Sequence, residues 1–93
     1  MMIITIQIIT IIVSSLHFNR EEISVIGKWA FNSCYSLKSI KLSDSITDIE
    51  VEAFYFCGGL KHIEFGSNLK HIGDYAFLEC TKLKSVILPS SLI

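Results

Sequence analysis

Apolar residues recur along this chain at one fixed spacing. The most regular marker is an Ala-Phe pair, followed three residues after the Phe by a Cys and three residues later by a Leu. The pairs begin at Ala30, Ala53 and Ala76, which gives a period of 23 for both intervals. A unit this short cannot enclose its own apolar side chains. The pattern therefore predicts a solenoid, in which stacked units share one continuous core.

Each unit contains a segment in which apolar and polar residues alternate, as in a half-buried strand. In the first complete unit, Ile40 and Leu42 are expected to point inward and Lys41 outward. The equivalent segments are Ile63-Glu64-Phe65 and Val86-Ile87-Leu88. If the units stack by translation, these segments form parallel strands of one sheet, each about 4.8 Å from the next.

The other half of the unit has a different spacing. Ile26, Ala30, Phe31 and Cys34 follow one another at intervals of 4, 1 and 3, which places them on one face of a helix. The segment is too short for a stable helix of its own, so the pattern predicts a single helical or 3₁₀ turn. Turn-forming residues follow the expected strands at positions 43–45, 66–68 and 89–91. Gly58-Gly59 marks a further bend before the strand of the second unit.

We expect one repeat domain over residues 16–93, with units at 20–42, 43–65 and 66–88 and a partial unit at 89–93. Leu16-His17-Phe18 resembles the later strand segments, although the interval from Leu16 to Ile40 exceeds the period by one. It is interpreted as the strand of an earlier incomplete unit, joined through a turn at residues 19–22. The stacked Phe side chains are expected to contribute most to stability.

Residues 1–15 are apolar and rich in β-branched side chains. The run is too short for a membrane-spanning helix, which needs about 20 residues. It matches the apolar core of a secretory signal peptide with cleavage after Ser15, but no Lys or Arg precedes it. The composition also suits a degenerate N-terminal strand, and an artefact of the gene model is a third alternative. The corresponding locations are secreted or cell surface for a signal peptide, and cytoplasmic otherwise.

The formal net charge is −1 and the hydrophobic content is 51%. The charge gives no global attraction to nucleic acid, and the hydrophobic content excludes a disordered chain. The three cysteines occupy equivalent positions, so we expect buried free thiols and no disulfides. The three histidines occupy three different positions in the units, and no spacing matches a zinc site, a calcium loop, a phosphate loop or a nucleophile elbow. We therefore expect no metal, no cofactor and no catalysis.

A candidate ligand-binding face lies on the outer side of the predicted sheet. Residues at equivalent positions are expected to form three neighbouring columns, which consist of Lys38, Lys61 and Lys84, then Ser39, His62 and Ser85, then Lys41, Glu64 and Ile87. Lys41 and Glu64 could pair across strands. The lysine column is interpreted first as a row of solvated side chains whose charged ends splay apart, with contact to an anionic partner as the alternative. Tyr35 and Tyr55 at the turns are further candidates for contact, although simple packing at the rim is the more common role of such residues.

The run Ile72-Gly73-Asp74-Tyr75-Ala76-Phe77, followed by Cys80, Leu83, Ser85-Val86 and Leu88-Pro89, resembles the BspA-type leucine-rich repeat. The resemblance covers residues 20–93 and implies a leucine-rich repeat solenoid of the α/β repeat type, curved, with a parallel sheet on one face. Members of this family are typically long cell-surface or secreted proteins that act as adhesins and protein-binding scaffolds, not as enzymes. This chain has fewer repeats than many members.

The leading hypothesis is a non-catalytic module that binds a protein or glycan on its sheet face. The alternative is a structural fragment of a longer repeat protein, with no binding function of its own, which self-associates through uncapped solenoid ends.

Overall fold

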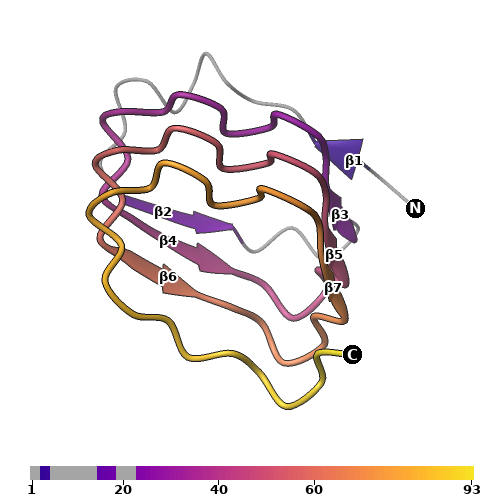
Figure 1. The fold of residues 1–93 in the computed structure, drawn as a ribbon. Coiled ribbons are helices and arrows are strands. Elements are labelled where there is room, and N and C mark those ends of the chain that lie inside the picture. The colour runs from indigo at the N-terminus through magenta and orange to yellow at the C-terminus, as the bar shows by residue number, and fades with distance from the viewer. Residues whose placement is uncertain (1–2, 5–14, 19–22) are drawn as a thin grey trace.

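The computed structural model describes residues 3–4, 15–18 and 23–93, and there the chain winds through stacked coils, each coil being one repeat of the solenoid (Figure 1). A coil passes through a strand of one sheet, a turn, a strand of a second sheet and a further series of turns, except that the last coil has no strand in the first of these sheets. The first sheet has the order β2-β4-β6, with β2 at Ser15–Phe18, β4 at Ser39–Leu42 and β6 at His62–Glu64. The second has the order β1-β3-β5-β7, with β1 at Ile3–Ile4, β3 at Val25–Ile26, β5 at Asp48–Ile49 and β7 at His71–Ile72.

All strand pairs are parallel, as the repeat predicted. Ile40 of β4 pairs with Ile63 of β6, its equivalent in the next repeat. Leu16 pairs with Ile40 in spite of the extra residue between them. This pairing confirms the prediction that Leu16-His17-Phe18 is the strand of an earlier repeat. The predicted turn at residues 19–22 lies outside the described residues.

The N-terminal segment is described only in part. Ile3–Ile4 forms β1 and pairs with β3, and Ser15 belongs to β2. Residues 1–2 and 5–14 lie outside the described residues. The choice between a signal peptide and an N-terminal strand therefore stays a prediction.

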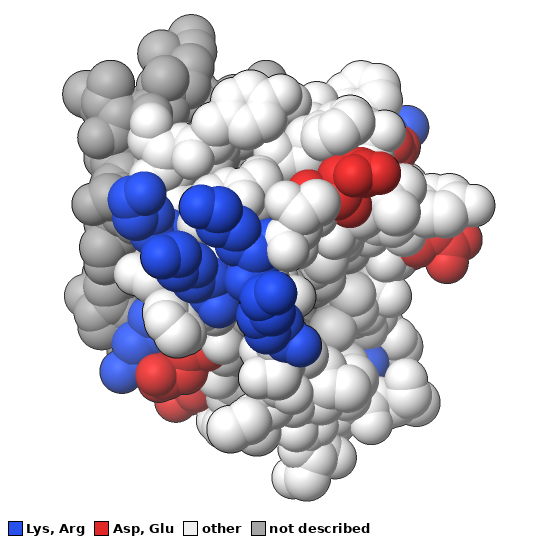
Figure 2. Space-filling model, turned by 60° about the vertical axis from the view of Figure 1, so that its left-hand side comes forward, with Lys and Arg blue, Asp and Glu red and all other residues white. Residues whose placement is uncertain are grey.

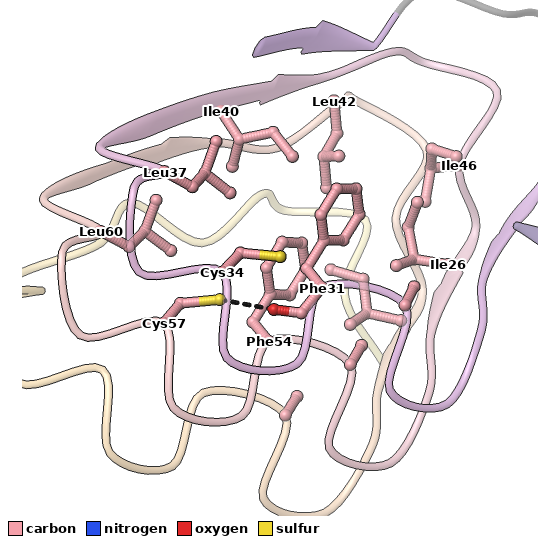
Figure 3. Close-up of a cluster of buried hydrophobic side chains, with 14 of the residues drawn as sticks. Ile26, Phe31, Cys34, Leu37, Ile40, Leu42, Ile46, Phe54, Cys57 and Leu60 are labelled. Atoms are coloured by element: carbon pink, nitrogen blue, oxygen red, sulfur yellow. Dashed lines mark hydrogen bonds between the residues drawn. The ribbon is translucent and has the colours of Figure 1, made fainter. Parts of the chain in front are cut away.

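The space between the two sheets and the turns is filled by one apolar core (Figure 3). At its centre, Phe31, Phe54 and Phe77 form a stack, called here the Phe ladder. The ring centroids are 4.9 Å apart between Phe31 and Phe54 and 5.1 Å apart between Phe54 and Phe77, and the planes are within 9° of parallel. Phe31 and Phe54 are fully buried and Phe77 is half-buried. The predicted inward direction of these side chains is confirmed.

The predicted helical or 3₁₀ turn is not confirmed, because the described residues contain turns but no helix of either kind. Ile26 instead belongs to β3, and the segment after it uses its backbone N–H groups alternately within the coil and between coils. Ala30 donates to the carbonyl of Gly27 in its own coil, whereas Phe31 donates to the carbonyl of Ala53 in the next coil, at 2.8 Å. An α-helix needs every N–H to bond four residues back. Bonding to the neighbouring coil satisfies these groups in another way.

The bends in this segment require left-handed backbone at two positions in each repeat. The first position is occupied by Trp29, Glu52 and Tyr75, and the second by Ser33, Phe56 and Glu79, with φ between 57° and 64°. Such φ values are uncommon for residues other than glycine. Their recurrence at the same positions shows that stacking between coils fixes the turn conformation in each repeat.

The expected strand at residues 85–88 is also wrong, since this segment forms no strand and Val86 is 41% exposed, against 3% for the equivalent Ile40. The coil that carries β6 packs closely on the coil before it because it has glycine on both sides of the strand. A Cβ atom at Gly59 would lie 2.4 Å from the carbonyl oxygen of Tyr35, and one at Gly66 would lie 2.3 Å from that of Ser43. In the last coil, the equivalent positions carry Lys82 and Pro89, and we infer that their side chains disfavour the same close approach.

Candidate functional site

The outer face of the β2-β4-β6 sheet is formed by the polar residues that alternate with the core residues of each strand. In β4, Ile40 and Leu42 are buried, whereas Lys41 between them is exposed. Lys41 lies opposite Glu64 in the register of the sheet, and its Nζ is 3.4 Å from a carboxylate oxygen of Glu64. The predicted ion pair is therefore confirmed. Both side chains are more than half exposed, so the pair contributes well under about 1 kcal/mol to stability.

A groove of about 830 Å³ runs over this face. It is lined by both columns predicted for the strands, and its floor includes apolar side chains of β4 and β6 and of the last coil. The lining residues are Ser39, Ile40, Lys41, His62, Ile63, Glu64, Phe65, Ser85, Val86, Ile87 and Pro89. Ile87 is 90% exposed. The groove thus combines polar side chains on its walls with an apolar contact surface toward the last coil.

The lysine column lies beside this groove, at the edge where β4 and β6 begin. The backbone N–H of Lys61 donates to the carbonyl of Lys38 at 2.8 Å, so these residues are direct neighbours in successive coils. Lysine side chains gather in one cluster on this edge of the molecule (Figure 2). A second hollow, of about 470 Å³, lies here and is lined by Lys61, His62, Thr81, Lys82, Lys84 and Ser85.

The structure thus brings together most residues of the predicted face, since the groove and the hollow contain all of them except Lys38. The contribution of Thr81 was not predicted. Lys82 and Lys84 lie on either side of the half-buried Leu83, and this alternation in the sequence was the signal that could have placed both on the outside.

Tyr35 is well exposed, whereas Tyr55 is half-buried and its ring centroid is 4.4 Å from that of Phe56. Sequence reasoning missed a second exposed surface on the turn side of the solenoid. Its large apolar residues are Trp29, Val51, Phe56, Tyr75 and Leu78. The Trp29 indole N–H donates to the Glu52 carboxylate at 3.4 Å, and the Lys28 Nζ lies 4.6 Å from the Trp29 ring centroid. These contacts hold Trp29 against the turns.

The cysteines are buried and free, as predicted. The Cys57 thiol donates to the carbonyl oxygen of Phe31 at 2.8 Å (Figure 3), and the Cys80 thiol donates to that of Phe54 at 3.0 Å. Contacts with the thiols of Cys34 and Cys80, together with burial, raise the pKa of Cys57. A thiol with a raised pKa is a poor nucleophile at neutral pH. In the described part of the chain, no group of three or more His, Cys, Asp or Glu side chains is arranged to hold a metal ion.

Comparison with known proteins identifies a repeat family, and a repeat family is consistent with the stacked coils described above. The sequence model of the BspA type leucine rich repeat region (6 copies) matches residues 10–93. The chain belongs to the BspA-type leucine-rich repeat family. No curated protein matches this BspA-type chain.

Among solved structures, the BspA-type chain is similar to the crystal structure of the T. pallidum leucine rich repeat protein (TpLRR). The two are 33% identical, with a TM-score of 0.74, over 75% of this chain and 33% of that chain. This chain therefore spans about a third of the length of TpLRR. The similarity supports the leucine-rich repeat fold.

Proposed function

We propose that this protein is a non-catalytic binding module, which holds a protein or glycan ligand in the groove over the outer face of β4 and β6. The observation that carries the proposal is the groove itself, in which polar columns of successive coils stand beside the exposed Ile87. A mixed surface of this kind suits a ligand with both polar and apolar parts. Leucine-rich repeat proteins commonly bind protein partners, which adds support by analogy.

We further propose an adhesin-like role at the cell surface or after secretion. BspA-type leucine-rich repeat proteins are typically found in these locations, and this part of the proposal rests on the family alone. Within the residues that the structure describes, no helix has the length and apolar character needed to cross a bilayer.

The test is an array that carries extracellular proteins and glycans, probed with the wild-type protein and two matched variants. Glu64→Arg/Ile87→Arg places large cations in the groove, whereas Asp74→Arg/Leu78→Arg makes the same charge change at exposed positions of the turn side. We expect ligands of the wild type to be lost by the groove variant and retained by the turn variant. Equal binding by both variants, or an array with no ligand for the wild type, would contradict the proposal.

One observation favours a second candidate function, which is self-association through the last coil. Val86, Ile87, Leu88 and Ile93 are all exposed, and exposed apolar side chains that lie together favour contact with another surface. Sedimentation over a range of concentrations tests this. A dimer that Leu88→Lys/Ile93→Lys dissociates would support self-association, and a monomer at all concentrations would exclude it.

A further inference from the structure

We propose that the hollow formed by Lys61, Lys82 and Lys84 is a binding site for an acidic polysaccharide, whose sulfate or carboxylate groups the lysines contact. The inference deepens the proposed function and rests on it, because it names the chemical class of one ligand and places that ligand at the edge of the groove. Three features of the hollow support this proposal. They are its positive charge, the lack of competing carboxylates and the lack of apolar side chains in its lining.

The charge of the hollow is positive although the chain as a whole carries a formal net charge of −1. Four of the seven lysines in the sequence belong to the cluster, namely Lys38, Lys61, Lys82 and Lys84. Like charges held this close repel one another. An anion bound between them relieves the repulsion, and the field is focused because the lysines surround a concave surface.

No carboxylate competes for these ammonium groups in the described structure. The lining of the hollow contains no Asp or Glu. Glu64, which lies on the neighbouring face, is already paired with Lys41. Within the described residues, none of the four clustered lysines forms an ion pair, so all four are available to an external anion. Figure 2 shows the cluster without an acidic side chain inside it.

The uncharged lining residues indicate a glycan and not a protein or a nucleic acid. Besides the three lysines, the hollow is lined by His62, Thr81 and Ser85, all of which form hydrogen bonds with hydroxyl groups. Protein interfaces depend on buried aromatic or other apolar anchors. Single-stranded nucleic acids are held by aromatic side chains on which the bases stack. No Phe, Tyr, Trp or large aliphatic side chain lines the hollow, and His62 supplies its one aromatic ring.

The arrangement of the lysines suits a chain-like anion. Lys38 and Lys61 lie in successive coils, which are about 4.8 Å apart in a parallel sheet, and Lys84 lies at the equivalent position one coil later in the sequence. A polysaccharide that carries one acidic group per sugar can therefore contact several lysines as it passes along the stack.

The test measures binding of dextran sulfate, with uncharged dextran, polyglutamate and an oligonucleotide as alternative probes. We expect the wild type to bind dextran sulfate more tightly than the other three, and the affinity to fall as salt is raised to about 0.15 M. Lys61→Gln/Lys84→Gln should weaken binding by about tenfold, because it removes two charge-assisted contacts. Lys28→Gln/Lys70→Gln makes the same change in net charge outside the hollow, and it should leave the affinity for dextran sulfate within about twofold of the wild-type value.

Equal weakening by the two double variants would overturn the proposal, because it would mean that only net charge matters. Tighter binding of polyglutamate or of the oligonucleotide would overturn the choice of a polysaccharide. Glu64→Arg/Ile87→Arg separates this proposal from the proposed function. If this variant loses its array ligands but keeps its affinity for dextran sulfate, the result supports both the groove and the hollow as binding sites. Failure of dextran sulfate to bind the wild type leaves the groove standing and removes only the hollow.

Discussion

The thiol of Cys57 donates a hydrogen bond of 2.8 Å to the carbonyl oxygen of Phe31, which lies one coil earlier in the stack. The same contact joins Cys80 to Phe54 in the next pair of coils. Successive coils are thus linked in two ways. The stacked rings of the Phe ladder form one link, and the hydrogen bonds from the cysteine thiols form the other. The cysteine acts here as a small apolar side chain with a weak donor.

Cys57→Ala should lower the free energy of unfolding by about 1–2 kcal/mol, because it removes the sulfur from a fully buried site and leaves a small cavity. Cys80→Ala should have a smaller effect, since Cys80 is 8% exposed. Urea unfolding of both variants measures this. A larger effect at Cys80 than at Cys57 would contradict the account.

Cys57 also makes stability depend on alkaline pH. Its pKa is raised in the folded state above the ordinary value of 9.0, so above about pH 9 the unfolded chain loses this proton while the folded chain keeps it. The folded state is therefore fully stabilised below about pH 9 and becomes less stable as pH rises further. We expect the melting temperature of the wild type to fall above about pH 9 more steeply than that of Cys57→Ala. Parallel slopes for the two proteins would show that this thiol does not titrate on unfolding.

Phe54→Ala should largely unfold the chain. Phe54 is fully buried between two other rings, and removal of such a side chain costs about 3–5 kcal/mol, against about 5–15 kcal/mol of total stability for a small domain. Phe77→Ala should be milder, because Phe77 is only half-buried. Circular dichroism during thermal unfolding tests the order. A Phe54→Ala variant that melts cooperatively within a few degrees of the wild type would contradict the role of the Phe ladder.

Asp44 should contribute stability that is lost in acid. The backbone N–H of Ser67 in the next coil donates to the Asp44 carboxylate at 2.8 Å, and this bond lowers the pKa of Asp44 below its ordinary value of 3.8. The contribution is present above pH 3.8 and disappears as pH falls through the lower folded value. Melting temperatures from neutral to acidic pH should fall less steeply for Asp44→Asn than for the wild type. Equal slopes for the wild type and Asp44→Asn would contradict this role of Asp44.

Pro89→Gly should allow the segment at residues 85–88 to approach β6. It removes the ring at the position where the preceding coil has Gly66, and each backbone hydrogen bond then gained is worth roughly 1 kcal/mol. Amide exchange over residues 85–88 should slow by about fivefold. Unchanged exchange would show that Pro89 does not hold this segment away. The double variant with Lys82→Gly should slow exchange further, since Lys82 occupies the position equivalent to Gly59.

The sequence was sufficient to predict the core and the strands β2, β4 and β6 of the first sheet. Phe31, Phe54 and Phe77 recur at a fixed spacing, and one buried column accounts for all three. Alternation around Lys41 correctly predicted β4 and its pairing with Glu64. These features follow from the alternation of apolar and polar residues and from its recurrence at a fixed period, both of which the sequence contains.

The second sheet could not be predicted in this way. Ile26, Ala30 and Phe31 have the spacing of a helical face, yet the N–H of Phe31 bonds to the next coil. Spacing within one repeat contains no information on hydrogen bonds between repeats. The hollow was missed for a related reason, because the contribution of Thr81 depends on where the last coil lies. The last coil retains the apolar pattern but carries Lys82 and Pro89 where the preceding coil has Gly59 and Gly66.

The alternation of backbone bonds after β3 has a consequence for how the molecule comes apart. Phe31 relies on Ala53 for its partner, and Phe54 relies in turn on Ala76, so a coil in the middle cannot open without depriving its neighbour of an acceptor. In the described residues, the segment that contains Val86 forms no such bond to another coil. Unfolding is therefore expected to begin at this segment and to proceed coil by coil toward Phe31.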